Sequence, residues 1–79
     1  MQIGILGGTF DPVHMGHLSL AEEARLQLGL DQVWLMPAGQ PWLKDGQEIS
    51  SAEDRLQMVR LAIVNNPYFH ASAVEVARL

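Results

Sequence analysis

Two histidines, His14 and His17, stand three residues apart, just after a segment that contains two glycines, a threonine and a proline. Residues three apart lie on one side of the first turn of a helix, so both imidazoles can lean toward one ligand. Their ring N–H groups are donors, and a helix start adds backbone N–H groups and a positive dipole end. Such donors suit a polyphosphate, and they stabilise the charge that builds up on a departing pyrophosphate.

Simpler roles exist for each residue of this segment. Either histidine alone is more often an exposed residue or a helix cap than a functional group. A metal site is the alternative for the pair, but no third ligand is near and His-x-x-His is not the usual zinc spacing, so we predict no metal ligand set. Thr9 and Asp11 can simply stabilise a turn whose φ angle Pro12 fixes. The coincidence of these features at one turn favours function.

An apolar strand and an amphipathic helix must position the histidines. Residues 2–8, QIGILGG, are apolar and end in glycines, which predicts a buried strand that runs into a tight turn. A helical pattern from His17 to about Leu28 predicts a helix that starts near Met15 or Gly16, with Gly29 as its C-cap. The apolar stripe of this helix comprises Leu18, Ala21, Arg25 and Leu28, widened by Leu20 and Ala24.

The second half of the chain repeats this alternation. Residues 32–38, QVWLMPA, predict a second buried strand, and residues 37–50 predict a long functional loop. Ser50 with Glu53 is typical of a capping box, so a second helix should begin there and run to about Asn65. Residues 68–79 predict a third strand from their β-branched and aromatic side chains. The apolar side of the second helix comprises Ala52, Leu56, Val59 and Ile63.

The order strand, helix, strand, helix, strand predicts an α/β fold, namely a Rossmann-like parallel sheet that forms the first half of a doubly wound fold. Ligands bind beyond the carboxyl ends of such strands, where Gly7 and Gly8 would let a phosphate approach the backbone. We expect one domain over residues 1–79, truncated at its C-terminus, because the chain stops as the third strand ends. An exposed sheet edge indicates a fragment of a longer enzyme, or a unit that associates with another copy.

Composition excludes several classes of function. The chain has 79 residues, of which 48% are hydrophobic and 18% charged, as expected for one small folded domain. Its net charge of −4 argues against a nucleic-acid or membrane partner, because no basic field would attract either. It has no cysteine, and no apolar stretch has the length of a membrane span or the pattern of a signal peptide. We therefore expect a cytoplasmic location.

The segment GGTFDPVHMGHL, residues 7–18, resembles the signature of the nucleotidyltransferase superfamily, which combines a glycine, a Thr-Phe pair and a His-x-Gly-His element. With VWLMPAGQPWLK and EDRLQMVRLAI, it is similar to bacterial nicotinate-nucleotide adenylyltransferases, enzymes of NAD biosynthesis. The resemblance extends from Gly4 to Arg78. It implies transfer of AMP from ATP to nicotinate mononucleotide, which forms deamido-NAD and pyrophosphate. It also implies Mg²⁺, carried with the ATP rather than by a protein cluster.

The resemblance implies roles for individual residues. His14 and His17 correspond to the catalytic pair that holds the ATP phosphates. Lys44 corresponds to a loop lysine near substrate phosphate, where a mobile cation can close over the ligand. For Arg55 the expectation comes from its position and not from the resemblance: at the start of the second helix it is expected to form a surface pair with Glu53 or Asp54, and contact with the ligand is its alternative. The segment whose backbone and hydroxyl line the nucleotide site corresponds to Gly7, Gly8, Thr9 and Phe10.

Departures from the family limit what the chain should do alone. Trp42 and Leu43 stand where the family often has Pro-His, so this loop offers no histidine. The family's later segments, which hold the nicotinate ring and grip the ATP phosphates with an arginine, do not occur in these residues. We therefore expect weak or absent turnover by the 79 residues. Preference between nicotinate and nicotinamide mononucleotide is not determined by this part of the sequence.

Two alternatives stay open. Phosphopantetheine adenylyltransferase shares the Gly-x-Phe-Asp-Pro opening, but it usually has Thr-x-Gly-His at positions 14–17 and lacks the Pro-x-x-x-Pro loop of residues 37–41. Outside the enzymes, the alternative is a non-catalytic nucleotide-binding module that exchanges strands with another copy.

Overall fold

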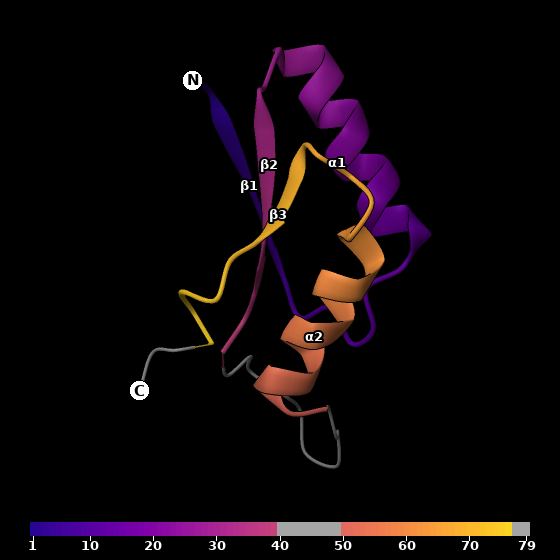
Figure 1. Cartoon of the computed structure of the whole chain (residues 1–79), viewed down its shortest axis with the longest axis vertical. Helices are drawn as coiled ribbons and strands as arrows, with labels where there is room; N and C mark the ends of the chain where they lie inside the picture. Colours follow the sequence, from indigo (N-terminus) through magenta and orange to yellow (C-terminus); the bar gives the residue numbers. More distant parts are fainter. Residues whose placement is uncertain (40–49, 77–79) are drawn as a thin grey trace.

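Strands and helices alternate along the chain in a computed structural model that describes residues 1–39 and 50–76. Figure 1 shows the strands side by side and the helices on one side of them. The α/β class, the parallel sheet and the predicted order of elements are confirmed. The elements are β1 (Ile3–Gly8), α1 (Met15–Leu28), β2 (Gln32–Pro37), α2 (Ala52–Ile63) and β3 (Phe69–Ala71).

The sheet brings the ends of β1 and β2 together. Its order is β1-β2-β3, all pairs are parallel, and Gly8 at the end of β1 faces Pro37 at the end of β2. The Ala38 amide donates to the Gly8 carbonyl at 2.8 Å, which carries the pairing one residue beyond the strands. The segments that follow both strands therefore start next to each other, and there the chain can assemble a site.

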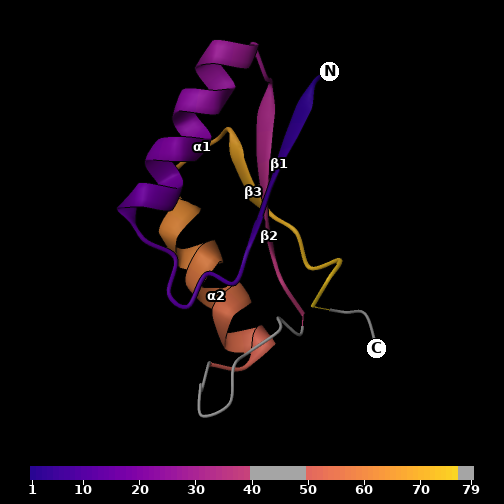
Figure 2. The same cartoon turned by 180° about the vertical axis from the view of Figure 1, so that it is seen from behind.

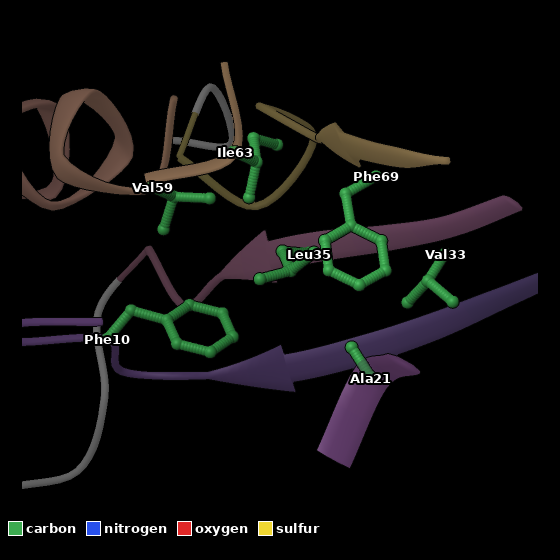
Figure 3. Close-up of a cluster of buried hydrophobic side chains, with 7 residues drawn as sticks. All are labelled: Phe10, Ala21, Val33, Leu35, Val59, Ile63 and Phe69. Carbon is green, nitrogen blue, oxygen red and sulfur yellow. The ribbon is translucent and has the colours of Figure 1, made fainter. Parts of the chain in front are cut away.

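The two helices cover one face of the sheet, as Figures 1 and 2 show from opposite sides. Alternate residues of β2, among them Val33 and Leu35, are buried on this face, and the cluster that they form with the helices is drawn in Figure 3. On the other face Ile3 is 41% and Ile5 64% exposed. The core cluster consists of Phe10, Ala21, Val33, Leu35, Val59, Ile63 and Phe69.

The predicted third strand is longer than the observed one. Of the described residues in this segment, only Phe69–Ala71 pair with β2, and residues 72–76 are not part of the sheet. Ser72 still donates its amide to the Leu35 carbonyl at 2.8 Å, but its hydroxyl accepts from the Val74 amide at 3.4 Å. This local bond turns the chain where alternation alone predicted a continuing strand.

Helix α1 shows both the success and the limit of the predicted apolar stripe. Gly29 caps its C-terminus in the left-handed conformation, with φ of 65°, as predicted. Ala21 is buried and Leu18 packs against the core. Leu20 and Leu28, however, are 55% and 67% exposed, because Leu20 lies on the opposite side of the helix from Leu18 and Leu28 is the last residue of the helix. Within residues 1–39 and 50–76, no helix has the length and apolar character to cross a membrane.

The N-cap of α2 lies one residue later in the chain than predicted. Ser51, and not Ser50, is the N-cap, and its hydroxyl accepts from the Asp54 amide at 3.1 Å. Ser50 instead bonds to Asp11, so the predicted Ser50–Glu53 capping box is wrong. The predicted apolar side is confirmed, since Leu56, Val59 and Ile63 are all buried.

Candidate functional site

The two histidines form the N-terminal cap of α1. His14 is the N-cap residue, with extended backbone, and its Nδ1 accepts from the Gly16 amide at 3.1 Å. The His14 amide in turn donates to Nδ1 of His17 at 3.0 Å, which completes a reciprocal capping box. The ring centroids lie 3.9 Å apart with 31° between the planes. The predicted convergence of both imidazoles at the helix start is therefore present.

The cap also fixes where each ring carries its proton. A ring nitrogen that accepts from a backbone N–H is unprotonated, so the neutral form of each histidine holds its proton on Nε2. No group among the described residues accepts from either Nε2. His14 is exposed and His17 partly so, which leaves two N–H donors for a ligand at one helix end.

The charge state of His17 agrees with this hydrogen bonding. Burial, and then the neighbouring His14 ring, lower the pKa of His17 from its usual 6.5. A lowered pKa keeps the imidazole neutral near neutral pH, so that Nδ1 can accept from the His14 amide. The capping box and the lowered pKa thus favour the same protonation state.

One backbone amide at the start of α1, that of Met15, adds to the donors, because the next three are already bonded. The His17 and Leu18 amides donate to the His14 carbonyl, and the Gly16 amide to the His14 ring. The Met15 amide has no acceptor among the described residues. The first turn of α1 also contains no acidic residue, so nothing on the helix itself offsets the positive end of its dipole. An anion is the ligand that this end favours.

Gly16 is required by the packing of the first histidine. A Cβ built at Gly16 would lie 2.9 Å from Cε1 and 3.0 Å from Nδ1 of His14. A side chain there would displace the imidazole from its cap. The glycine between the histidines therefore leaves room for the first ring, a steric requirement that helix propensity does not reveal.

The residues at the end of β1 and just after it, Gly7 to Phe10, lead to the histidines, and Phe10 contacts one of them. Gly7 is exposed and Gly8 and Thr9 are partly buried. Phe10 has a left-handed backbone, with φ of 53°, and its side chain is 2% exposed. Its ring meets the His17 ring edge-on, with centroids 4.9 Å apart. The Phe10 ring thus contacts His17 from within the core. Because the ring is buried, only the backbone of Phe10 can contact a nucleotide.

Two residues, Asp11 in the turn after β1 and Arg55 in the first turn of α2, form long-range contacts that the sequence does not signal. Asp11 accepts from both the amide and the hydroxyl of Ser50, at 2.7 and 2.9 Å. Arg55 is 1% exposed and donates to carbonyl groups of residues that follow β1 and β2. The expected surface pair of Arg55 with Glu53 or Asp54 is wrong. No local pattern marks these contacts, because their partners are distant in the sequence.

The remaining candidates fall outside what the structure tests. Lys44, and the Trp42–Leu43 departure beside it, lie outside the described residues. Within residues 1–39 and 50–76, no three histidine or acidic side chains are grouped so as to hold a metal ion.

A family model and the sequences of known proteins both match this chain. The family model described as cytidylyltransferase-like matches residues 5–79. A relative from Dehalococcoides mccartyi, named "Probable nicotinate-nucleotide adenylyltransferase", is 55% identical over 99% of this chain. Relatives of the same name from Roseiflexus sp. and Saccharopolyspora erythraea are 54% and 49% identical over 96% and 98% of it.

These relatives are much longer than the chain. The aligned part covers 38% of the Dehalococcoides and Roseiflexus proteins and 36% of the Saccharopolyspora protein. The family match, in contrast, takes in nearly all of the chain, including β1, the histidine cap and both helices. By fold and by sequence, this chain belongs to the cytidylyltransferase-like family.

Proposed function

We propose that the chain supplies the triphosphate site of an adenylyltransferase that transfers AMP from Mg·ATP to nicotinate mononucleotide. The relatives' shared name supports this choice of reaction. The geometry at the start of α1 supports the choice of site, since two Nε2–H donors stand at a helix end that favours anions. We also propose that His14 and His17 bind the ATP phosphates. The segment that lines the nucleotide site with its backbone is then Gly7, Gly8, Thr9 and Phe10, and Lys44 provides a positive charge to the substrate phosphate.

The reaction needs positioning and charge stabilisation, and it needs no nucleophile from the protein. A phosphate oxygen of nicotinate mononucleotide attacks the α-phosphorus of ATP and forms a new P–O bond. The bond from the α-phosphorus to the bridging oxygen breaks, and its electron pair leaves with pyrophosphate. Donors on the leaving phosphates stabilise this growing charge, which is the contribution we assign to His14 and His17. Mg²⁺ enters as part of the ATP substrate.

The observation that carries the proposal is the use of both Nδ1 atoms in the helix cap. The cap holds the rings in place and leaves both Nε2–H groups as donors that no described residue accepts from. A cap built from serine and glutamate would stabilise the helix equally well, but it would offer one hydroxyl donor beside a carboxylate in place of two imidazole N–H donors. The histidines therefore have a role beyond stabilising the helix.

Variants that keep the cap but lose the imidazoles test this directly. Asparagine is a good N-cap and glutamine suits the third helical position of a capping box, so His14→Asn with His17→Gln should preserve α1. We expect Mg·ATP affinity, measured by calorimetry, to fall about 10- to 100-fold, since the side-chain amides do not place an N–H where the Nε2–H groups stand, and the hydrogen bonds to a charged group are lost. The control is Gln57→Asn on the exposed side of α2. Equal ATP affinity in all three proteins, or no ATP binding by the unaltered chain, would refute the proposal.

An acceptor assay separates the related reactions. With labelled ATP, the chain is offered nicotinate mononucleotide, nicotinamide mononucleotide or phosphopantetheine, and any adenylylated product is identified. We expect ATP binding with weak or absent turnover, because the chain spans 38% of the relatives it matches. Normal turnover would contradict that expectation, and product from phosphopantetheine alone would favour the related enzyme instead.

The proposed substrates bear on location and partners. ATP and nicotinate mononucleotide are cytoplasmic metabolites, so we place the protein in the cytoplasm and assign it no nucleic-acid or membrane partner. One domain over residues 1–79 and association through the exposed sheet edge stay predictions. Light scattering across a range of protein concentrations tests the second, and a stable dimer that binds ATP without turnover would favour the strand-exchanging module.

A further inference from the structure

Arg55 is buried at the start of α2, where its guanidinium joins three segments of the chain. The side chain is 1% exposed, yet all the hydrogen bonds that it donates to described residues end on backbone carbonyls. These acceptors are Ser50 at 3.0 Å from Nε, Thr9 and Ala38 at 3.0 and 2.6 Å from Nη1, and Gly39 at 3.2 Å from Nη2.

The three segments are those that assemble the candidate site. Thr9 follows β1, Ala38 and Gly39 follow β2, and Ser50 precedes the cap of α2. A planar guanidinium presents five donors in a fixed fork, so it can hold several carbonyls in a defined arrangement. An ammonium group has no such fork, and therefore lysine cannot reproduce these four contacts.

The bond from Arg55 to the Thr9 carbonyl holds the residue before Phe10, whose ring contacts His17. Phe10 comes next and has a φ of 53°, a conformation that a bulky residue keeps only where its surroundings hold it. Its ring is buried and contacts the His17 ring edge-on at 4.9 Å. Arg55 thus holds the carbonyl before Phe10, and Phe10 sets the place of His17.

A second contact fixes the other side of Phe10. Asp11 accepts from the amide and the hydroxyl of Ser50, while the carbonyl of Ser50 accepts from Arg55. The residues before and after Phe10 are therefore both anchored at the start of α2. A shift of Phe10 would therefore strain these bonds.

We propose that Arg55 is a positioning residue for the triphosphate site, one that acts through Thr9 and Phe10 on the imidazole of His17. This inference rests on the proposed function, in which His17 binds ATP. It assigns Arg55 no contact with the substrate. Instead, the guanidinium couples the start of α2 to the histidine cap of α1.

The conservative variant Arg55→Lys tests the coupling, with Arg60→Lys, an exposed position on the same helix, as control. Three quantities are measured: the free energy of unfolding, the imidazole ¹⁵N shifts of His14 and His17 with the Phe10–His17 ring NOEs, and the affinity for Mg·ATP. We expect Arg55→Lys to move the His17 shifts, weaken the NOEs and lower ATP affinity about tenfold, since a misplaced donor loses most of a charged hydrogen bond. Arg60→Lys should change none of these.

A purely structural role would give a different pattern. If Arg55→Lys lowers the free energy of unfolding but leaves the His17 shifts, the NOEs and the ATP affinity of the folded protein unchanged, the proposal is wrong. The NMR readout needs no ligand. Hence a chain that binds no ATP would refute the proposed function, while the His17 shifts would still decide whether Arg55 positions the ring.

The unaltered chain provides the test if Arg55→Lys does not fold. Coupling is reciprocal, so an ATP site that depends on the Arg55 contacts must strengthen them when ATP binds. We then expect Mg·ATP to slow hydrogen exchange at Nε of Arg55 and not at Nε of Arg60. Exchange at Arg55 that ATP leaves unchanged would overturn the proposal.

Discussion

The two helices begin at the same end of the sheet but use their first turns in opposite ways. At α1 the cap is His14, the first turn has no acidic side chain, and both imidazoles keep an N–H donor that no described residue accepts from. At α2 the cap is Ser51, the first turn contains Glu53 and Asp54, and Arg55 turns into the protein.

The difference shows how one physical feature serves two purposes. Every helix start has unpaired N–H groups and a positive dipole end. At α2 the chain's own acidic residues offset that end, and the nearby cation serves to hold loops together. At α1 nothing on the helix offsets it, so the attraction for an anion remains available to a ligand.

The largest effect should come from removing the buried contacts at α2. Arg55→Met leaves carbonyl groups of three segments without their donor, and we expect a loss of about 3–5 kcal/mol in the free energy of unfolding, because each buried carbonyl left unpaired costs about 1–3 kcal/mol. Urea denaturation measures it, with the exposed Arg60→Met as control. A loss below about 1 kcal/mol, the size of an ordinary surface change, would contradict the buried role.

Variants of the two serines before α2 should distinguish the bond of Ser50 to Asp11 from the helix cap of Ser51. Ser50→Ala removes the hydroxyl bond to the Asp11 carboxylate, at a cost of about 2 kcal/mol, typical of a bond to a charged group. Ser51→Ala removes the cap, at a cost of about 1 kcal/mol. Only Ser51→Ala should speed hydrogen exchange at the Asp54 amide. Faster exchange in Ser50→Ala instead would restore Ser50 as the cap.

At α1, Gly16→Ala should impair binding more than folding. The added methyl displaces the His14 ring, and we expect Mg·ATP affinity to fall about 3- to 10-fold, part of a charged hydrogen bond. Stability should change little, because alanine gains about 1 kcal/mol of helix propensity over glycine and offsets the lost cap. Ser19→Ala, exposed on the same helix, is the control and should leave affinity unchanged.

The smallest effect should be that of pH on the histidine cap. The pKa of His17 is lower in the folded chain than its usual 6.5, so the unfolded chain takes up the proton first as pH falls. The stabilisation is therefore complete above pH 6.5 and is lost as pH falls from there through the lowered pKa. Urea denaturation between pH 7.5 and 5 should show it, and His17→Gln should flatten the dependence. An equal slope in both proteins would contradict this assignment.

Much of the fold could be predicted from local patterns. The glycines at the end of β1, the helical spacing of Leu56, Val59 and Ile63, and Gly29 as a C-cap all follow from propensities that act over a few residues. The histidine pair could be placed at a helix start by the same reasoning. Spacing alone did not show that these rings themselves form the cap, because serine and aspartate are the usual residues there.

The length of β3 and the identity of the second cap could not be predicted. Alternation suggested a strand over residues 68–79, but a local bond of Ser72 ends the pairing after Ala71. Likewise, Ser50 and Ser51 are equivalent candidates by sequence. The choice between them was made by Asp11, which lies 39 residues from Ser50 and occupies its hydroxyl.

By itself, then, the sequence determined the order of strands and helices and put two imidazoles at the opening of α1, because turn chemistry and hydrophobic period are properties of neighbouring residues. The tertiary structure alone decided that Phe10 lies beneath His17 and that Arg55 is buried. The Thr9 carbonyl and the Arg55 guanidinium are 46 residues apart in the chain. They meet because parallel strands end at the same edge of the sheet, an arrangement that no local pattern encodes.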